Sequence, residues 1–317
     1  AAGTQDLVAN STGGGTTTFG DGAGSDDVGA ATALQNLTTN ADGLTDLNAT
    51  SLTTTQDQTY NDAVIVGTSG TGAALTTINA NDTTFNSTLD ATTAGVESLT
   101  VNSSRTAGAN AVLEGFGPDG LEGTADDPAT DDDIGFTTFG SAIADGSDDN
   151  VGGIAALASL LTNADGAVVI NSASVTTTVS QTHNDAAFLG TSGTGNATTT
   201  LSGVAVSFNS TTDAAVAGAQ SLIVNATGAT TFGDGAGSDN VGVGDSAGLV
   251  AGSGSLAYLV TDANTGPVGP GTTVINSSTV TTTFGTGDQT YNDGVILGSN
   301  TSAGGAPTPA PAPAPAP

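Results

Sequence analysis

The chain of 317 residues carries 31 acidic side chains against a single basic one, and it contains no cysteine, methionine or tryptophan. This balance excludes nucleic acid as a partner, because binding to phosphates requires clustered Lys and Arg side chains. The missing cysteines exclude disulfides and thiolate chemistry, and no apolar run approaches the roughly 18 residues that membrane insertion requires. We expect an extracellular or cell-surface protein, since a start at Ala1, Ala2 and Gly3 is typical of a secreted chain after signal cleavage.

Two segments recur along the chain. The first reads LTTTQDQTYNDAVIVG at 52–67, VTTTVSQTHNDAAFLG at 175–190 and VTTTFGTGDQTYNDGVILG at 280–298. The second reads LVANSTGGGTTTFGDGAGSDDVG at 7–29 and LIVNATGATTFGDGAGSDNVG at 222–242. Repetition at a fixed period predicts a solenoid or another array of repeats.

The spacing between repeats is kept without gaps. Leu37 and Leu99 are 62 residues apart, as are their equivalents Leu160 and Leu222. Such a strict register is expected where coils stack and a change of length would break the stack. We therefore predict one continuous solenoid over 1–305 with a unit of about 92 residues. Its parts are unit one at 7–98, unit two at 99–221 with an acidic insertion at 105–134, and a partial unit three at 222–300.

The predicted secondary structure is β throughout. Segments 44–55, 58–67 and 75–89 are rich in Thr and Val, alternate apolar with polar residues, and are bounded by Gly, Asn and Asp. With only 4% aromatic residues the interior must be thin, which favours a parallel β-helix of about twelve coils of 20–25 residues, about 60 Å long. Tandem β-sandwich domains of about 90–100 residues are the alternative fold.

Equivalent interior positions follow from the stacking of coils. We expect Phe19, Phe139 and Phe232 to be equivalent, and likewise Phe85 and Phe208. From 306 the chain reads APTPAPAPAPAP, which favours an extended polyproline II tail that docks on a neighbouring subunit or acts as a linker.

The segments LTVN, TTFG, VTTT and QTYNDAV resemble the repeats of bacterial surface proteins of the filamentous-haemagglutinin and autotransporter kind. The resemblance covers residues 7 to about 300. It implies a secreted parallel β-helix that serves in adhesion, surface coating or fibre formation.

The insertion GFGPDGLEGTADDPATDDDIG at 115–135 is the segment with the most distinctive cluster of acidic side chains. Its carboxylates crowd into a Gly-rich segment that can bend around a hard cation, and it resembles the calcium loops of bacterial surface proteins. We predict Ca²⁺ binding there, with a solvated acidic loop as the alternative. The candidate ligands are Asp119, Glu122, Asp126, Asp127, Asp131, Asp132 and Asp133.

Three Gly- and Asp-rich loops at 20–29, 145–152 and 233–242 are weaker cation candidates. Their acids are Asp21, Asp26, Asp27, Asp145, Asp148, Asp149, Asp234 and Asp239. Asp is also the residue whose short side chain bonds its own backbone in tight turns, and we expect this turn role to dominate.

Several other residues invite a functional interpretation. His183 is the single histidine, but Tyr60 and Tyr291 occupy its place in the other units, so we expect a substituted surface or half-buried position. Arg105 is too solitary to bind a polyanion. Five sequons could carry glycans, at Asn10, Asn36, Asn86, Asn209 and Asn225.

The functional prediction depends on the strand edges at the two ends of the solenoid. The repeats start at an LVAN strand and stop after Gly298, so we expect both end coils to expose unpaired strand edges, which recruit other chains. We therefore predict a homopolymer built head to tail, the structural subunit of an extracellular bacterial filament or surface layer. An adhesin fragment that binds host or surface glycans is the alternative. We do not expect an enzyme, because the acids lie in repeated loops and the bases needed to hold a polyanionic substrate are missing.

Overall fold

The computed structural model describes residues 3–22, 26–67, 75–104, 134–141, 149–164, 166–190, 198–235, 239–244, 250, 252–262, 271–283 and 287–298. These residues form strands, turns and bends, without a helix among them. In particular, they include no helix long and apolar enough to cross a membrane. The insertion from Arg105 to Asp133 and the Pro/Ala-rich tail 306–317 lie outside the described residues, so docking of that tail stays a prediction.

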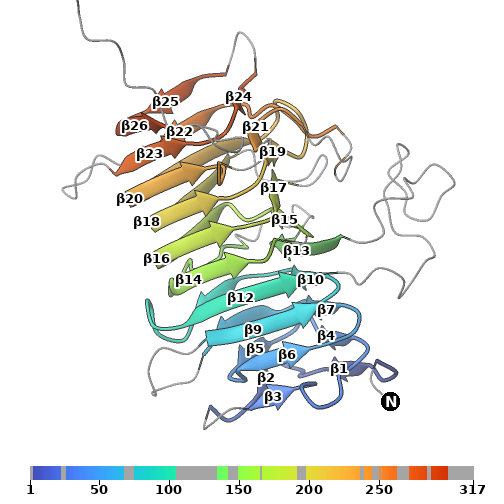
Figure 1. Cartoon of the computed structure of the whole chain (residues 1–317). Helices are drawn as coiled ribbons and strands as arrows, with labels where there is room; N and C mark the ends of the chain where they lie inside the picture. Colours follow the sequence, from blue (N-terminus) through green and yellow to red (C-terminus); the bar gives the residue numbers. More distant parts are fainter. Residues whose placement is uncertain are drawn as a thin grey trace, which may run out of the picture.

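The strands wind into a parallel β-helix with three stacks of strands around the axis (Figure 1). The first stack is a ten-stranded sheet, with one strand from each coil, so the described chain makes ten coils. In order its strands are β1 (Leu7–Ala9), β4 (Leu37–Thr39), β7 (Gln58–Tyr60), β10 (Thr83–Phe85), β13 (Gly135–Phe139), β15 (Gly166–Ile170), β17 (Ala186–Leu189), β19 (Thr212–Ala214), β21 (Asn240–Val241) and β24 (Thr279–Val280).

The second and third stacks share three long strands that continue around a corner. These are β16 (Ser174–His183), β18 (Thr198–Phe208) and β20 (Ser221–Phe232), with register shifts at the corner. The second stack also holds β2 (Thr16–Phe19), β5 (Leu44–Leu47), β8 (Ala63–Val66), β11 (Leu89–Ala91), β22 (Leu259–Thr261) and β25 (Gln289–Tyr291). The third stack also holds β3 (Asp27–Val28), β6 (Ser51–Thr53), β9 (Leu75–Ala80), β12 (Ser98–Ser103), β14 (Leu157–Thr162), β23 (Thr272–Ile275) and β26 (Gly294–Leu297).

Every pair of described strands is parallel. The predicted parallel β-helix is therefore confirmed, and the alternative of tandem β-sandwich domains is wrong. The ten described coils are fewer than the expected twelve because corner loops lengthen several of them. The coil between β10 and β13, for example, runs from Thr83 to Gly135.

One repeat unit does not fill a whole number of coils. The equivalent strands β4, β14 and β22 lie in the first, third and second stacks, in the second, fifth and ninth coils. A unit therefore spans three and two-thirds coils, and each unit is turned by one stack relative to the one before. As a result Phe19, Phe139 and Phe232 are equivalent in sequence but lie in three different stacks.

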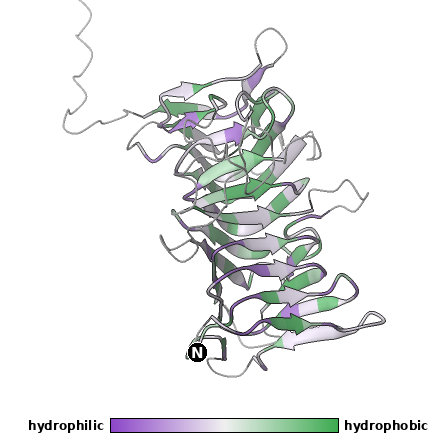
Figure 2. Ribbon diagram, turned by 90° about the vertical axis from the view of Figure 1, so that its right-hand side faces the viewer, coloured by the Kyte–Doolittle hydropathy of each residue, from purple (hydrophilic) through white to green (hydrophobic). Residues whose placement is uncertain are grey.

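The interior is built from rows of side chains that run parallel to the axis, and Figure 2 shows hydrophobic positions recurring from coil to coil. In the first stack one row crosses from unit one into unit two; it reads Tyr60, Phe85, Phe139, Ile170, Leu189 and Ala214. The third stack repeats this order one unit later; its row reads His183, Phe208, Phe232, Ile275 and Leu297. Neighbouring units thus contribute side chains to the same row. An insertion or deletion inside a strand of one unit would therefore shift its residues out of line with those of the next unit.

Aromatic rings stack within these rows. The ring centroids of Tyr60 and Phe85 are 5.1 Å apart, and those of Phe85 and Phe139 are 5.6 Å apart. In the third stack, Phe208 lies 5.3 Å from His183 and 5.5 Å from Phe232. Aromatic contacts at this separation add roughly 0.5–1.5 kcal/mol to the burial of the rings. Five of the twelve Phe and Tyr residues therefore stack in these two rows.

Candidate functional site

The strongest predicted cation ligands lie outside the described residues. This applies to the whole set from the insertion, Asp119, Glu122, Asp126, Asp127, Asp131, Asp132 and Asp133, and to Asp145 and Asp148 of the second loop. Calcium binding by these side chains stays a prediction.

One acid in each of the three loops accepts a hydrogen bond from a backbone N–H. Asp26 accepts a hydrogen bond from the N–H of Asp21 at 2.8 Å, and Asp239 accepts one from the N–H of Asp234 at 2.9 Å. Asp149 does the same for Ser141, also at 2.9 Å. These three carboxylates occupy equivalent positions and fix the same turn in three units, as expected for short acidic side chains.

Asp27 has a different role from its neighbour in the loop. Its carboxylate accepts hydrogen bonds from the hydroxyls of Ser51 and Thr50 in the next coil, at 2.6 and 2.8 Å. These bonds lower the pKa of Asp27. Across the described ranges, no three His, Asp or Glu side chains gather in a way that could hold a metal ion. In the described residues these loops therefore supply carboxylates that bond to backbone N–H groups and to hydroxyls, and calcium binding in them stays a prediction.

Two of the sequon asparagines take part in side-chain ladders. The amide of Asn86 donates to Asn61 at 2.8 Å, and that of Asn209 donates to Asn184 at 2.8 Å. Asn36 donates to Asp6, also at 2.8 Å. A glycan on any of these three nitrogens would compete with the hydrogen bond that the nitrogen donates. Asn10 is exposed, and Asn225 lies within β20.

The repeated segment QT(Y/H)ND carries an internal hydrogen-bond network that the sequence did not reveal. The amide of Gln58 donates to the carbonyls of Leu52 and Asn79, both at 3.1 Å, and its oxygen accepts from the hydroxyl of Tyr60 at 2.7 Å. Gln58 and Tyr60 are fully buried. The recurrence of its Gln and Asp unchanged in all three copies is the feature of the sequence that could have indicated this network.

The aspartate of the same segment points into the solenoid. Asp62 is 2% exposed and accepts hydrogen bonds from the hydroxyls of Thr39 at 2.7 Å and Thr45 at 2.8 Å. In unit three, Asp293 accepts from Thr261 at 3.1 Å and from Thr273 at 2.8 Å. A buried carboxylate needs such donors, and they connect successive coils through the interior.

His183 is fully buried, so the expectation of a surface or half-buried position is wrong. It lies where the other units have Tyr60 and Tyr291, and alternation along QTH places it on the inward side of β16. Neither ring nitrogen has a hydrogen-bond partner within the described structure, and the same holds for the side-chain oxygen of Gln181. Burial lowers the pKa of His183 to about 4, so the imidazole is neutral at pH 7.

A second departure from the repeat lies in unit three. Asp262 stands where units one and two have Asn40 and Asn163. Each of these three side chains accepts a hydrogen bond from a backbone N–H of the preceding coil. Asp262 is 6% exposed and lies against Asp293. Burial, followed by the hydrogen bond to Asp293 and its charge, raises the pKa of Asp262 to about 6.

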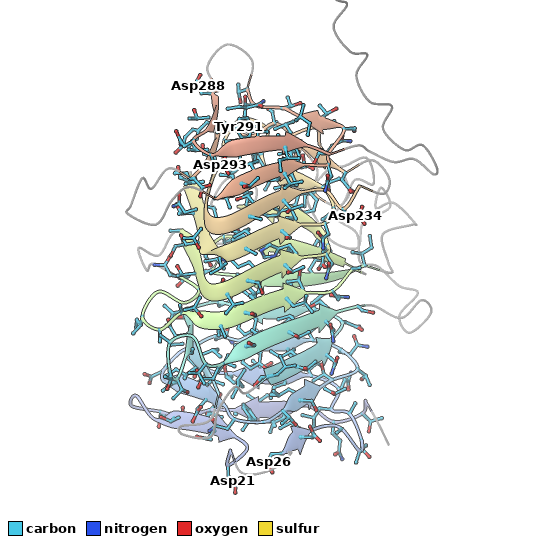
Figure 3. All side chains as sticks on the ribbon, turned by 60° about the vertical axis from the view of Figure 1, so that its left-hand side comes forward. Asp21, Asp26, Asp234, Asp288, Tyr291 and Asp293 are labelled. Atoms are coloured by element: carbon cyan, nitrogen blue, oxygen red, sulfur yellow. The ribbon has the colours of Figure 1, made fainter. Side chains whose placement is uncertain are left out.

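The coil formed by β24, β25 and β26 presents its interior positions to solvent. Val295 is 42% exposed and Leu297 is 77% exposed, whereas their equivalents Val64 and Val66 in β8 are fully buried. Tyr291 is partly buried in the same coil, and its pKa is raised by that burial. Figure 3 shows Tyr291, Asp288 and Asp293 at this end of the solenoid and Asp21 and Asp26 at the opposite end.

Comparison of the chain with protein-family models, with curated proteins and with solved structures gave no match. The class of the protein therefore rests on its own architecture, a three-sided parallel β-helix built of repeat units.

Proposed function

We propose that the chain is a structural subunit of an extracellular filament or surface layer and that it polymerises head to tail through its end coils. The observation that carries this proposal is the exposure of Val295 and Leu297, which occupy core positions of the repeat. Burying such a side chain contributes about 1.5–3 kcal/mol, so covering this end by another coil is favourable.

The strand edges of the two end coils support the same contact. Among the described strands, β24, β25 and β26 have no neighbour on one side, and β1, β2 and β3 have none on the other. Each such edge offers unpaired N–H and C=O groups to another parallel strand. The two ends are different surfaces on one axis, so their contact propagates along that axis into an open filament and not a closed ring.

Assembly of the full chain can be followed by sedimentation velocity and by negative-stain electron microscopy over a range of protein and NaCl concentrations. We expect rods that lengthen with protein concentration. Val295→Asp places a charge in the contact and is expected to weaken assembly at least tenfold. Thr182→Asp adds the same charge on the outward side of β16, in the middle of the solenoid, and is expected to assemble like the unmodified chain.

Single particles at the highest concentrations, in high salt and with calcium present, would contradict the filament. That result would favour the alternative of an adhesin fragment that binds glycans. Circular dichroism of both variants shows that a loss of assembly is not a loss of folding.

A further inference from the structure

Two short segments at opposite ends of the solenoid are copies of segments that already pair inside it. Residues 289–291 read Gln-Thr-Tyr, as do residues 58–60, and residues 17–19 read Thr-Thr-Phe, as do residues 83–85. Residues 289–291 are β25 in the last described coil, and residues 17–19 lie in β2 in the first.

The internal pair shows how these sequences fit. Strand β10 lies directly on β7, with Thr83 opposite Gln58, Thr84 opposite Thr59 and Phe85 opposite Tyr60. The two rings stack at 5.1 Å with an interplanar angle of 10°. The tyrosine hydroxyl remains bonded to its own glutamine, and the same bond joins Tyr291 to Gln289 at 3.1 Å. The unpaired edge of β25 therefore presents the same side chains, joined by the same hydrogen bond, as β7 presents to β10.

We propose that residues 17–19 of a second copy of the chain pair with residues 289–291 in the register of the internal pair. This inference rests on the proposed head-to-tail assembly and specifies its register. Thr17, Thr18 and Phe19 of the second copy then lie opposite Gln289, Thr290 and Tyr291. Both segments belong to the second stack, so the two solenoids continue each other without a change of stack.

The same placement also satisfies the other two stacks. In the repeat, β1 and β2 correspond to β12 and β13, which lie directly on β9 and β10. The last described coil, β24–β25–β26, corresponds in the repeat to β6–β7–β8, on which β9, β10 and β11 lie. In the proposed contact the first coil of the second copy, β1–β2–β3, takes the place of β9–β10–β11. It brings Ala9 of the second copy over Val280 and Val28 over Val295, so small apolar residues meet in the first and third stacks.

Competing arrangements place other residues beside Thr290. A slide by two residues along the strand brings Thr16 of the second copy opposite it. A rotation by one stack brings Val8 or Asp27 opposite it instead. None of these three arrangements stacks a ring on Tyr291. The rotation that brings β3 onto β25 also places the acidic Asp27 beside β25.

The chain has no cysteine, so disulfide trapping can read the register directly. Thr18 and Thr290 are both exposed and point outward, so cysteines there leave the core unchanged. Thr290→Cys is mixed separately with Thr18→Cys, Thr16→Cys, Val8→Cys and Asp27→Cys under mild oxidation, and mixed dimers are quantified on non-reducing gels. The double variant Thr59→Cys/Thr84→Cys is the matched control, because its two cysteines are opposite each other within one chain.

We expect the mixture with Thr18→Cys to form at least ten times more mixed dimer than any other mixture. Rods that cross-link best through another position would overturn the proposed register and leave the head-to-tail filament standing. Complete oxidation of the control together with monomers in every mixture would overturn both proposals.

Discussion

In unit two His183 occupies the position of a tyrosine in the other units, and the hydrogen bond from that tyrosine to the glutamine is missing. The hydroxyl of Tyr60 bonds Gln58 at 2.7 Å, whereas the side-chain oxygen of Gln181 has no partner in the described structure. His183→Tyr supplies that hydroxyl in a site built for it. We expect a gain of about 1 kcal/mol in the free energy of unfolding at pH 7, measured by urea denaturation.

The same substitution changes the dependence of stability on pH. The pKa of His183 is about 4 in the folded chain and 6.5 in an exposed histidine, so the unfolded state takes up the proton first. Stability is therefore lost as pH falls from 6.5 towards 4. His183→Phe is the control: it removes this loss but leaves the side-chain oxygen of Gln181 without a hydrogen-bond partner. Equal stability of the Tyr and Phe variants at pH 7 would contradict the hydrogen-bond argument.

Asp262 provides an opposite dependence on pH in unit three. Its pKa is raised from 3.8 to about 6, so the folded chain holds the proton more tightly than the unfolded chain. The resulting stability is present below pH 3.8 and is lost as pH rises through 6. Asp262→Asn removes the charge and restores the asparagine of units one and two. We expect slower hydrogen exchange in β22 to β26 at pH 7.5 and little change at pH 4.

Asp288→Asn is the matched control for this variant. It removes one charge from an exposed position in the next coil, which is the coil that holds Asp293. If both variants slow exchange equally at pH 7.5, the effect comes from net charge and not from the contact of Asp262 with Asp293.

At the scale of elements, one glycine corner recurs in all three units. Gly152 has a φ of +68°, and a Cβ there would collide with the backbone oxygen of Thr176 in the next coil. Gly29 and Gly242 stand in the same place with φ of +78° and +70°. We expect Gly152→Ala to lower the free energy of unfolding by at least about 2 kcal/mol, from the left-handed backbone and the close contact.

Gly153 offers a control at the next position. Its φ lies outside the left-handed region, and a Cβ there would approach the side chain of Asn150 at 3.0 Å. Gly153→Ala is expected to lower the urea midpoint less than Gly152→Ala does, because it adds only the contact with Asn150 and no left-handed backbone strain. An equal loss in both variants would show that the corner tolerates no side chain at either position, contrary to the geometric argument.

The sequence predicted the kind of fold well but not the path of the coils. Alternating Thr and Val indicated strands, and the strict register indicated stacking. The period of about 92 residues says nothing about how many corners it contains, because β16, β18 and β20 pass a corner with extended backbone and no sequence break. The turn role of Asp26 was readable from its Gly-rich loop. Equivalence to Tyr60 did not predict the burial of His183, because Tyr occurs both inside and at the surface of proteins; the alternation along the strand places both residues inward.

At the scale of the whole molecule, charge opposes the proposed assembly. The chain has a formal net charge of −30, so two copies that approach end to end repel each other. The Debye length falls from about 30 Å at 0.01 M salt to about 3 Å at 1 M. We expect the protein concentration needed for rods to fall at least tenfold over this range of NaCl, measured by light scattering. Assembly that weakens with salt would contradict a contact made mainly by apolar rows and strand edges.

Calcium provides a separate test of the acidic insertion. Screening depends on ionic strength, whereas binding to a set of carboxylates depends on the ion, so CaCl₂ and MgCl₂ at equal ionic strength distinguish the two. If the insertion binds calcium, CaCl₂ raises the melting temperature more than MgCl₂ does, and the difference disappears in Asp131→Asn/Asp132→Asn/Asp133→Asn. Equal effects of the two salts, unchanged in this variant, would mean that the insertion acts only as a charged loop.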